Sequence, residues 1–323
     1  MFISNLNVPP YESKSEDKNI VFKTSTKVPC RDPFIMLIGD TYYLYKSGMS
    51  EAWGTDKQKS REISILCYKS KDLENWYDPK VVLNSSDVSH GVKDMFWAPE
   101  CHYYKGYYYI FTSVFSSHTN HRCISVYRSE SPEGPFTDIA GGFITPKEWD
   151  TIDGTLYIDE ENKPWMVFVH EWTSMPEGNG SMAAARLSED FTHFISEPIN
   201  LFYARDAKWA SSGVTDGPYL YRSSEGKLMM IWSNFSEKGY CVGLASSVSG
   251  KVEGPWVQSE KPIYEKDLKE GFKYEGGHAM IFKDKEANLK ITFHAPNGKT
   301  PDGDFEHVII RDIKETNGKL EIR

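Results

Sequence analysis

The sequence has 323 residues, 39% of them hydrophobic and 14% aromatic, so it can bury a large core and is not that of a disordered chain. Its formal net charge of −9, with no Lys/Arg cluster, disfavours nucleic acid as a partner, because binding phosphates requires a basic face. The five cysteines are scattered and never spaced C-x-x-C, which indicates neither a disulfide framework nor a zinc ribbon.

The beginning of the chain bears on location. Residues 1–19 contain no basic stretch followed by an apolar run, and no later segment approaches the roughly 18 apolar residues of a membrane span. We therefore expect no membrane association and a cytoplasmic protein, or a secreted one if a signal peptide was removed. Residues 1–27 are predicted to form an N-terminal extension, because they lie outside the repeat that follows.

One strand pattern recurs from residue 28 to residue 323 with a period of roughly 60 residues. Five hairpins each combine two aromatic or β-branched runs with a polar turn, at 33–47, 99–113, 154–171, 217–235 and 277–296. A second strand pair follows each hairpin, at 63–79, 123–139, 182–198, 240–258 and 307–322. Four strands in each of five repeats predict an all-β chain folded as a five-bladed β-propeller.

Two β-sandwiches of about 150 residues each are the competing interpretation, which the length allows. No linker supports it, because Pro, Gly and Ser are spread evenly and the repeat runs across the midpoint. The propeller is therefore favoured.

The first strand of each propeller blade lines the central channel, so residues just before these strands gather at one mouth of it. The residues at these positions are Asp32, Trp97 with Glu100, Asp153, Asp216 and His278. Asp-Pro and Asp-Gly are ordinary turn dipeptides, as Asp302 and Gly303 show in a plain loop. Recurrence at corresponding repeat positions favours a site, because carboxylates brought together repel and raise the pKa of at least one of them.

Five segments, CRDPFI, FWAPE, IDGTLYIDEENKPW, TDGPYLYR and EGGHAMIF, occur in this order from about residue 28 onward. Together they resemble the signature of glycoside hydrolase family 43. The resemblance implies an inverting mechanism with three acidic residues. By position, Asp32 matches the general base, Asp153 the residue that orients the acid and tunes its pKa, and Asp216 the general acid.

Position 216 departs from the commonest family pattern, in which Glu precedes Gly-Pro, and Asp is shorter by one methylene group. Glu171, in the segment VHEW, is the rival for the general acid, and Glu100 and Glu275 are the remaining candidates. Inversion needs a base that holds water on one face of the sugar and an acid of raised pKa on the other. Carboxylates from separate blades provide that separation.

Four loops between second and third strands are predicted to surround the substrate, at 48–60, 115–121, 171–180 and 295–306. Their length favours a pocket that removes one terminal sugar. The predicted substrate-binding residues are Trp97, Glu100, Glu171, His278, Trp53 and Phe115, with Trp172 and Phe235 as further stacking candidates.

No cofactor is required for this chemistry. The resemblance allows a calcium ion in the central channel beside His278, held through water because calcium prefers six to eight oxygen ligands. His118 and His121 lie in a loop without a third ligand, which argues against a metal clamp there.

The predicted function is an inverting glycoside hydrolase that releases α-L-arabinofuranose from oligosaccharides derived from plant polysaccharides. A β-xylosidase or an endo-arabinanase of the same fold is the alternative. From another class, a non-catalytic propeller that binds glycans through the same mouth remains open. The serine-hydrolase, zincin and nucleotide-binding motifs are missing from the sequence.

Overall fold

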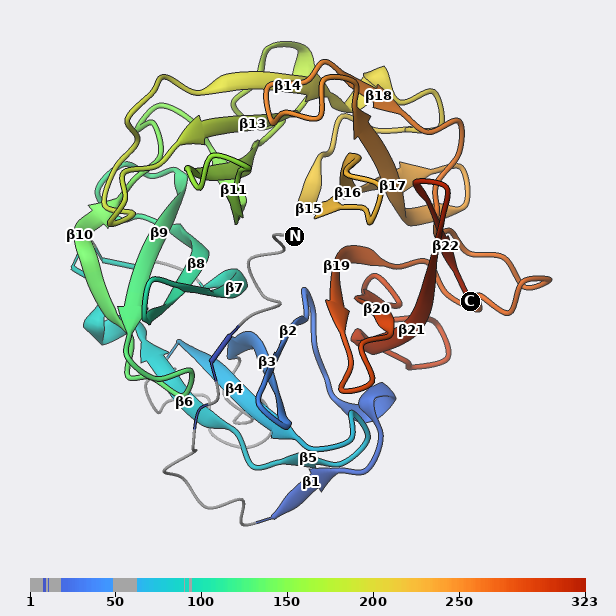
Figure 1. Cartoon of the computed structure of the whole chain (residues 1–323), viewed down its shortest axis with the longest axis horizontal. Helices are drawn as coiled ribbons and strands as arrows, with labels where there is room; N and C mark the ends of the chain where they lie inside the picture. Colours follow the sequence, from blue (N-terminus) through green and yellow to red (C-terminus); the bar gives the residue numbers. More distant parts are fainter. Residues whose placement is uncertain (1–7, 10, 12–18, 49–62, 90, 93–94) are drawn as a thin grey trace.

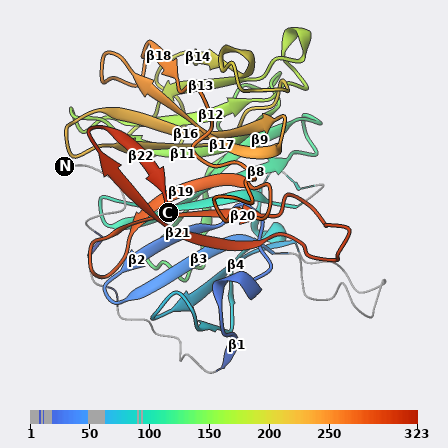
Figure 2. The same ribbon diagram turned by 90° about the vertical axis from the view of Figure 1, so that its right-hand side faces the viewer.

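The computed structural model describes residues 8–9, 11, 19–48, 63–89, 91–92 and 95–323. Figure 1 shows five antiparallel sheets arranged as blades around a central axis, and Figure 2 shows the same ring from its edge with β21 and β22 toward the viewer. The predicted fold class, an all-β five-bladed propeller, is confirmed. The two-sandwich alternative is wrong, because the repeat closes into one ring.

Blade 1 contains six strands in the order β1-β5-β4-β3-β2, with β6 also paired to β4. Their bounds are β1 Ile20–Phe22, β2 Phe34–Ile38, β3 Thr41–Gly48, β4 Ser64–Ser70, β5 Trp76–Tyr77 and β6 Lys80–Asn84. Strand β1 belongs to the predicted N-terminal extension and forms the outer edge of this blade, because it pairs with β5.

Blades 2 to 5 each contain four strands paired in chain order. Blade 2 contains β7 Trp97–Tyr104, β8 Tyr107–Phe115, β9 Arg122–Ser129 and β10 Thr137–Phe143, and blade 3 contains β11 Thr151–Ile158, β12 Pro164–His170, β13 Ser181–Arg186 and β14 Ile199–Tyr203. Blade 4 contains β15 Asp216–Arg222, β16 Leu228–Ser236, β17 Gly239–Ser247 and β18 Trp256–Gln258, and blade 5 contains β19 Gly277–Lys283, β20 Leu289–Ala295, β21 His307–Thr316 and β22 Lys319–Ile322.

The helical content is limited to single 3-10 turns at Ser25–Lys27, Ser85–Asp87, Pro176–Gly178 and Ala204–Asp206 in the part of the chain that the structure describes. Over the same residues, no helix has both the length and the apolar character that crossing a membrane requires.

The inner strands are buried on both faces, because each blade packs between two others. Every residue of β11 and of β12 is buried, and β12 is accordingly an almost continuous apolar run rather than an alternation with polar residues. Aromatic rings fill the space between blades, as where Tyr104 lies 4.8 Å from Phe191 and Phe202 lies 5.3 Å from Trp232. All five cysteines are buried and free.

The ring closes through the segment that precedes β2. Pro29 pairs with His307 at the start of β21, and Cys30 N–H donates to Glu306 O at 3.1 Å. Val308 N–H donates in turn to the carbonyl oxygen of Val28 at 3.2 Å. These backbone bonds hold the segment just before Asp32 against blade 5.

Candidate active site

The first strands of blades 2 to 5 share a β-bulge close to where they begin. At each bulge one residue has a left-handed backbone, and Asp32 takes the same conformation just ahead of β2. These residues and their φ angles are Asp32 (53°), Ala98 (44°), Asp153 (57°), Gly217 (50°) and His278 (54°). Such a conformation bends the strand and changes the direction of the side chain.

This register corrects one expectation from the sequence. Asp32, Asp153 and His278 do occupy equivalent positions, but Asp216 lies one residue before its equivalent, Gly217. Similarly, Trp97 precedes Ala98 and Glu100 follows it by two residues. The side chains therefore reach the mouth from different backbone positions, and the repeat alone does not give their directions.

Backbone bonds between blades hold the bulges in place. In each case the acceptor is a side chain on the second strand of the preceding blade: Asp153 N–H donates to Ser113 Oγ (2.9 Å), His278 N–H to Ser233 Oγ (2.8 Å) and Asp32 N–H to His294 Nδ1 (3.3 Å). The groups at the mouth are thus positioned by the propeller framework rather than by loops.

The contact between blades 3 and 4 departs from this pattern. On the second strand of blade 3, the position that corresponds to Ser113 and Ser233 is occupied by Val169, which pairs with Ile152 and has no side-chain acceptor. Gly217 N–H instead donates to Asp153 Oδ2 at 2.9 Å. The carboxylate of Asp153 therefore fixes the backbone immediately after Asp216.

Asp32 is surrounded by cationic and imidazole groups. Its Oδ1 lies 3.1 Å from His278 Nδ1, 3.3 Å from His294 Nδ1 and 3.9 Å from Arg31 Nε. Burial opposes ionisation of this carboxyl group, but His278, His294 and Arg31 together outweigh burial and hold the pKa of Asp32 well below its ordinary value. Asp32 is therefore a carboxylate throughout the neutral range.

Asp153 lies in the opposite electrostatic situation. It is 4% exposed, and burial, together with the negative charges of Asp216 and Asp32, raises its pKa to about 7. His278 Nδ1, 3.7 Å from Asp153 Oδ2, opposes this shift. The pKa of His278 is raised, because Asp32, Asp153 and Asp216 together outweigh its own burial.

Asp216 also has a raised pKa, chiefly because it is buried and because Asp32 carries a negative charge nearby. Tyr240, a fully buried residue of β17, donates its hydroxyl hydrogen to Asp216 Oδ2 at 2.9 Å. His278 and this bond act in the opposite direction and limit the rise in the pKa of Asp216. The site therefore pairs a permanently ionised carboxylate with one that binds its proton more tightly.

Glu171 follows β12, and its backbone N–H donates to Asp150 O at 2.8 Å. Burial, together with the negative charges of Asp216 and Asp150, raises the pKa of Glu171 to about 7. Glu171 and Asp216 thus influence each other, and both have the protonation behaviour of an acid. Glu275, a minor candidate for the acid, accepts the backbone N–H of Tyr240 at 2.8 Å instead.

A family model described as glycosyl hydrolases family 43 matches residues 26–318. The chain belongs to this family. Its members are inverting glycosidases, so this protein is an enzyme that hydrolyses O-glycosyl bonds of oligosaccharides or polysaccharides.

Three proteins that are similar to this chain carry different enzyme names. An endo-arabinase structure from Bacteroides thetaiotaomicron VPI-5482 is 36% identical, with a TM-score of 0.76 over 94% of this chain and 100% of that one. An endo-1,4-beta-xylanase structure from the same organism is 26% identical, with a TM-score of 0.74 over 94% and 97%. The extracellular exo-alpha-(1->5)-L-arabinofuranosidase ArbA of Cellvibrio japonicus is 23% identical over 80% of this chain and 72% of its own.

In this family 43 enzyme, the sequence reasoning missed Arg122, the first residue of β9. Its guanidinium carbon lies 3.1 Å from the centroid of the Trp97 ring and 5.6 Å from that of Phe115. Arg122 also counteracts the rise in the pKa of Glu171. One face of Trp97 is therefore covered by a cation, and sugar stacking on Trp97 and Phe115 stays a prediction. Arg122 is nearly buried directly opposite Phe115, which the sequence alone does not show.

Glu100 is buried at the inner strand of blade 2. It is 4% exposed, and its Oε2 lies 2.9 Å from His102 Nε2. The ring of His102 packs edge-on against Phe34 at 5.1 Å, which in turn lies 6.4 Å from Tyr219. These side chains fill the channel below the site, and a contact of Glu100 with substrate stays a prediction.

The loop residues have varied surroundings. Trp172 is 45% exposed, whereas Phe235 is half-buried with its ring 5.1 Å from Tyr240. His121 Nδ1 lies 3.0 Å from Asp150 Oδ1. Trp53 and most of the loop at 48–60 lie outside the described residues.

The surroundings of His278 do not fit a calcium site. The described residues include no group of three or more His, Cys, Asp or Glu side chains arranged to hold a metal ion. The Nδ1 of His278 faces Asp32 and Asp153, and its raised pKa favours the cationic imidazolium, which repels a metal ion. The ion in the channel stays a prediction, and the chemistry below uses side chains alone.

Proposed function

We propose that this enzyme hydrolyses α-L-arabinofuranosyl linkages with inversion of the anomeric configuration. The observation that carries the proposal is the contrast between Asp32, whose pKa is lowered, and Asp216, whose pKa is raised, at one mouth of the propeller. Inverting hydrolysis requires this pair of opposite properties. The same contrast favours catalysis over a non-catalytic glycan-binding propeller.

Asp32 acts as the general base. Its ionised carboxylate accepts a proton from a water molecule, whose oxygen attacks the anomeric carbon from the face opposite the leaving group. His278 Nδ1 lies 3.1 Å from Oδ1 and holds the carboxylate in place through that oxygen, which leaves Oδ2 for the water.

Asp216 acts as the general acid and donates its proton to the departing glycosidic oxygen. Because Tyr240 occupies Oδ2, the proton that is transferred is carried by Oδ1. Asp153 orients this group by binding Gly217 N–H, and its negative charge makes Asp216 harder to ionise whenever Asp153 is itself ionised. Glu171 is the alternative acid, supported by its own raised pKa.

Arabinose is favoured as the sugar because relatives of both kinds, the endo-arabinase structure and the exo-arabinofuranosidase, are named for arabinan. Xylose is the alternative, supported by the similarity to the endo-1,4-beta-xylanase structure. A panel of 4-nitrophenyl glycosides tests the choice. We expect turnover of the α-L-arabinofuranoside that the Asp32→Ala variant abolishes, and preferential turnover of the β-D-xyloside would overturn the assignment.

Release of one terminal arabinose is the proposed mode of action, and internal cleavage is the second candidate, favoured by the 36% identity to an endo-arabinase. The products formed early from linear arabinan separate the two modes. Terminal removal yields only arabinose while the polymer shortens slowly, whereas internal cleavage yields a mixture of oligosaccharides and a rapid loss of viscosity.

The cellular location stays a prediction. ArbA, the curated relative above, is named as an extracellular enzyme, which supports secretion over the cytoplasm. Detection of the native protein in culture supernatant or in the cell lysate distinguishes the two.

A further inference from the structure

A cavity of about 540 Å³ lies at the rim of blade 5. Three connecting segments line it: residues 26–29 ahead of β2, 271–274 ahead of β19 and 303–307 between β20 and β21. Segments of these kinds lie at the same end of a propeller as the starts of the first strands. The cavity therefore opens on the same side of the ring as the carboxylates and lies outward from Asp32.

The lining includes an apolar surface that continues into the core. Tyr264 lies 4.3 Å from Phe293 and 4.9 Å from Phe272, measured between ring centroids. The rings of Phe272 and Tyr274 are half-buried, so part of each remains accessible. A surface of this kind suits the C–H faces of a sugar ring, and the cavity volume lies within the range of small-molecule sites.

Both carboxylates in the lining of the cavity already have a positively charged partner. Asp304 accepts a hydrogen bond from the Tyr274 hydroxyl and lies 3.5 Å from Lys273 Nζ. Glu306 Oε1 lies 2.9 Å from Arg31 Nη1. Neither acid leaves an unbalanced negative charge at the wall of the cavity.

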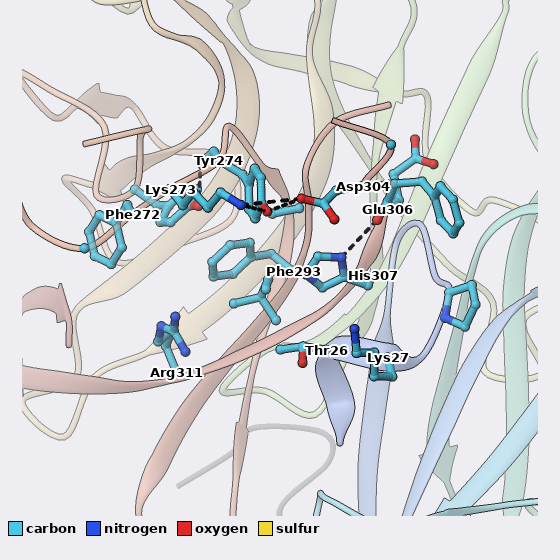
Figure 3. Close-up of a pocket in the computed structure, with 17 residues that line it drawn as sticks. Thr26, Lys27, Phe272, Lys273, Tyr274, Phe293, Asp304, Glu306, His307 and Arg311 are labelled. Atoms are coloured by element: carbon cyan, nitrogen blue, oxygen red, sulfur yellow. Dashed lines mark hydrogen bonds and ion pairs between the residues drawn. The ribbon is translucent and has the colours of Figure 1, made fainter. Parts of the chain in front are cut away.

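Two cations in the lining are not compensated in this way. Over the described residues, neither Lys27 nor Arg311 forms an ion pair with a carboxylate, and both are exposed. In Figure 3 Arg311 and Lys27 lie at the two ends of the lower side of the cavity, and Lys273, Tyr274 and Asp304 lie along the upper side. The cavity therefore carries excess positive charge in a chain whose formal net charge is −9.

We propose that this cavity binds a uronic acid residue, the carboxylated sugar of acidic polysaccharides. The positive charges of Lys27 and Arg311 attract the carboxylate, while Phe272 and Tyr274 contact the sugar ring. The inference rests on the proposed function in one respect: the uronate is part of the same polysaccharide as the linkage that the enzyme cleaves. The cavity then holds an acidic segment of the polymer while the neighbouring arabinose enters the mouth beside Asp32.

A single residue, Arg31, connects the lining of the cavity to the general base Asp32. Glu306 lines the cavity and binds Arg31, whose Nε lies 3.9 Å from Asp32 Oδ1. A polymer that fills the cavity is therefore presented next to the general base. Small arabinosides reach only the mouth, so their hydrolysis does not depend on the cavity.

Binding of trigalacturonate to the intact protein, measured by isothermal titration calorimetry, tests the proposal. We expect wild type to bind trigalacturonate at least about tenfold more tightly than neutral α-1,4-galactotriose, because charge-assisted hydrogen bonds are lost with the neutral sugar. The double variant Lys27→Met, Arg311→Met should lose at least about tenfold in affinity for trigalacturonate. Lys23→Met, a nearby exposed lysine outside the lining, is the matched control and should bind as wild type does.

The proposal is overturned if wild type shows no preference for trigalacturonate over the neutral trisaccharide, or if the double variant binds it as wild type does. Displacement of trigalacturonate by equimolar inorganic phosphate would also overturn it, since the site would then attract any anion. Binding needs no turnover, so failure of the proposed arabinosidase activity leaves this test intact. Unchanged kcat/KM of the double variant on 4-nitrophenyl α-L-arabinofuranoside verifies that the carboxylates are undisturbed.

Discussion

The hydroxyl group of Tyr240 donates to Asp216 Oδ2 at 2.9 Å, which fixes the shorter carboxylate at the position where the family pattern leads one to look for Glu. The ring of Tyr240 stacks on that of His294, at 5.7 Å and 26°, and His294 contacts Asp32. One buried tyrosine thus touches the acid directly and the base through a single intervening residue.

Replacing Tyr240 by Phe removes this hydrogen bond and keeps the ring. Because the bond stabilises the ionised carboxylate, we expect the pKa of Asp216 to rise in this variant. The alkaline limb of the pH profile of kcat/KM should therefore move to higher pH, while turnover of substrates with poor leaving groups falls. Tyr221→Phe is the matched control, since that hydroxyl binds Glu315 away from the mouth. An alkaline limb that stays in place in Tyr240→Phe would show that the tyrosine does not act on the acid.

The identity of the general acid can be decided by comparing leaving groups. Asp216→Asn should retain most activity on an arabinoside with a 2,4-dinitrophenyl leaving group and lose about 100-fold or more on one with a poor leaving group. Glu171→Gln should reduce both rates to a similar extent, because Glu171 is expected to contact substrate rather than donate the proton. The reverse pattern, selective loss in Glu171→Gln, would transfer the role of acid to Glu171.

The raised pKa of Asp153 makes a prediction about stability. With a pKa of about 7 in the folded state and an ordinary value in the unfolded state, folding binds a proton between these two values. The free energy of unfolding of wild type should therefore fall as pH rises from about 4 to about 7. Asp153→Asn, which can still accept Gly217 N–H, should make this fall smaller, since Glu171 and Asp216 still contribute to it, and should be more stable at neutral pH by on the order of 2 kcal/mol.

Asp32 provides the opposite control. Its lowered pKa contributes stability that is present above the ordinary carboxyl pKa and is lost only as pH falls through the folded-state value. Asp32→Asn should therefore be less stable than wild type at neutral pH. Urea unfolding of both variants at pH 4 and pH 7 measures the two effects, and a loss of stability in Asp153→Asn at pH 7 would contradict the assigned electrostatics.

Gly217 is required where blades 4 and 5 meet. Its φ is 50°, and a Cβ there would lie 2.8 Å from Cγ of His278, the residue that contacts Asp32. We expect Gly217→Ala to destabilise the fold by about 2–3 kcal/mol and to lower kcat/KM by about 100-fold, through strain and displacement of His278.

Gly226→Ala is the comparison for this variant. Gly226 also has a left-handed backbone, with φ of 83°, but a Cβ there meets open space. It should cost about 1 kcal/mol of stability and leave the kinetics unchanged. Equal kinetic effects of the two substitutions, with thermal unfolding measured alongside, would rule out the role assigned to the contact between Gly217 and His278.

Much of this architecture was predictable from the sequence, because hairpin patterns and turn residues repeat locally. The positions of Asp32, Asp153 and Asp216 at one mouth followed from the topology of a propeller. The one-residue offset of Asp216 did not, because β-bulges leave no distinct pattern in a strand whose five central residues are all buried.

Contacts between distant residues were equally inaccessible to sequence reasoning. The bond from Tyr240 to Asp216 joins residues on different strands, and Arg122 of β9 reaches Trp97 of β7 across the intervening strand β8. The acceptor role of Asp153 toward Gly217 depends on Val169 lacking a polar side chain, which becomes visible only once the blades are placed side by side.

The stereochemistry of the first product is the most direct measurement of the proposed mechanism. Proton NMR during early hydrolysis of 4-nitrophenyl α-L-arabinofuranoside records which anomer forms before mutarotation. If Asp32 activates water opposite the leaving group, β-L-arabinofuranose appears first and the α anomer follows by mutarotation. Initial appearance of the α anomer would contradict inversion and, with it, the roles assigned to Asp32 and Asp216.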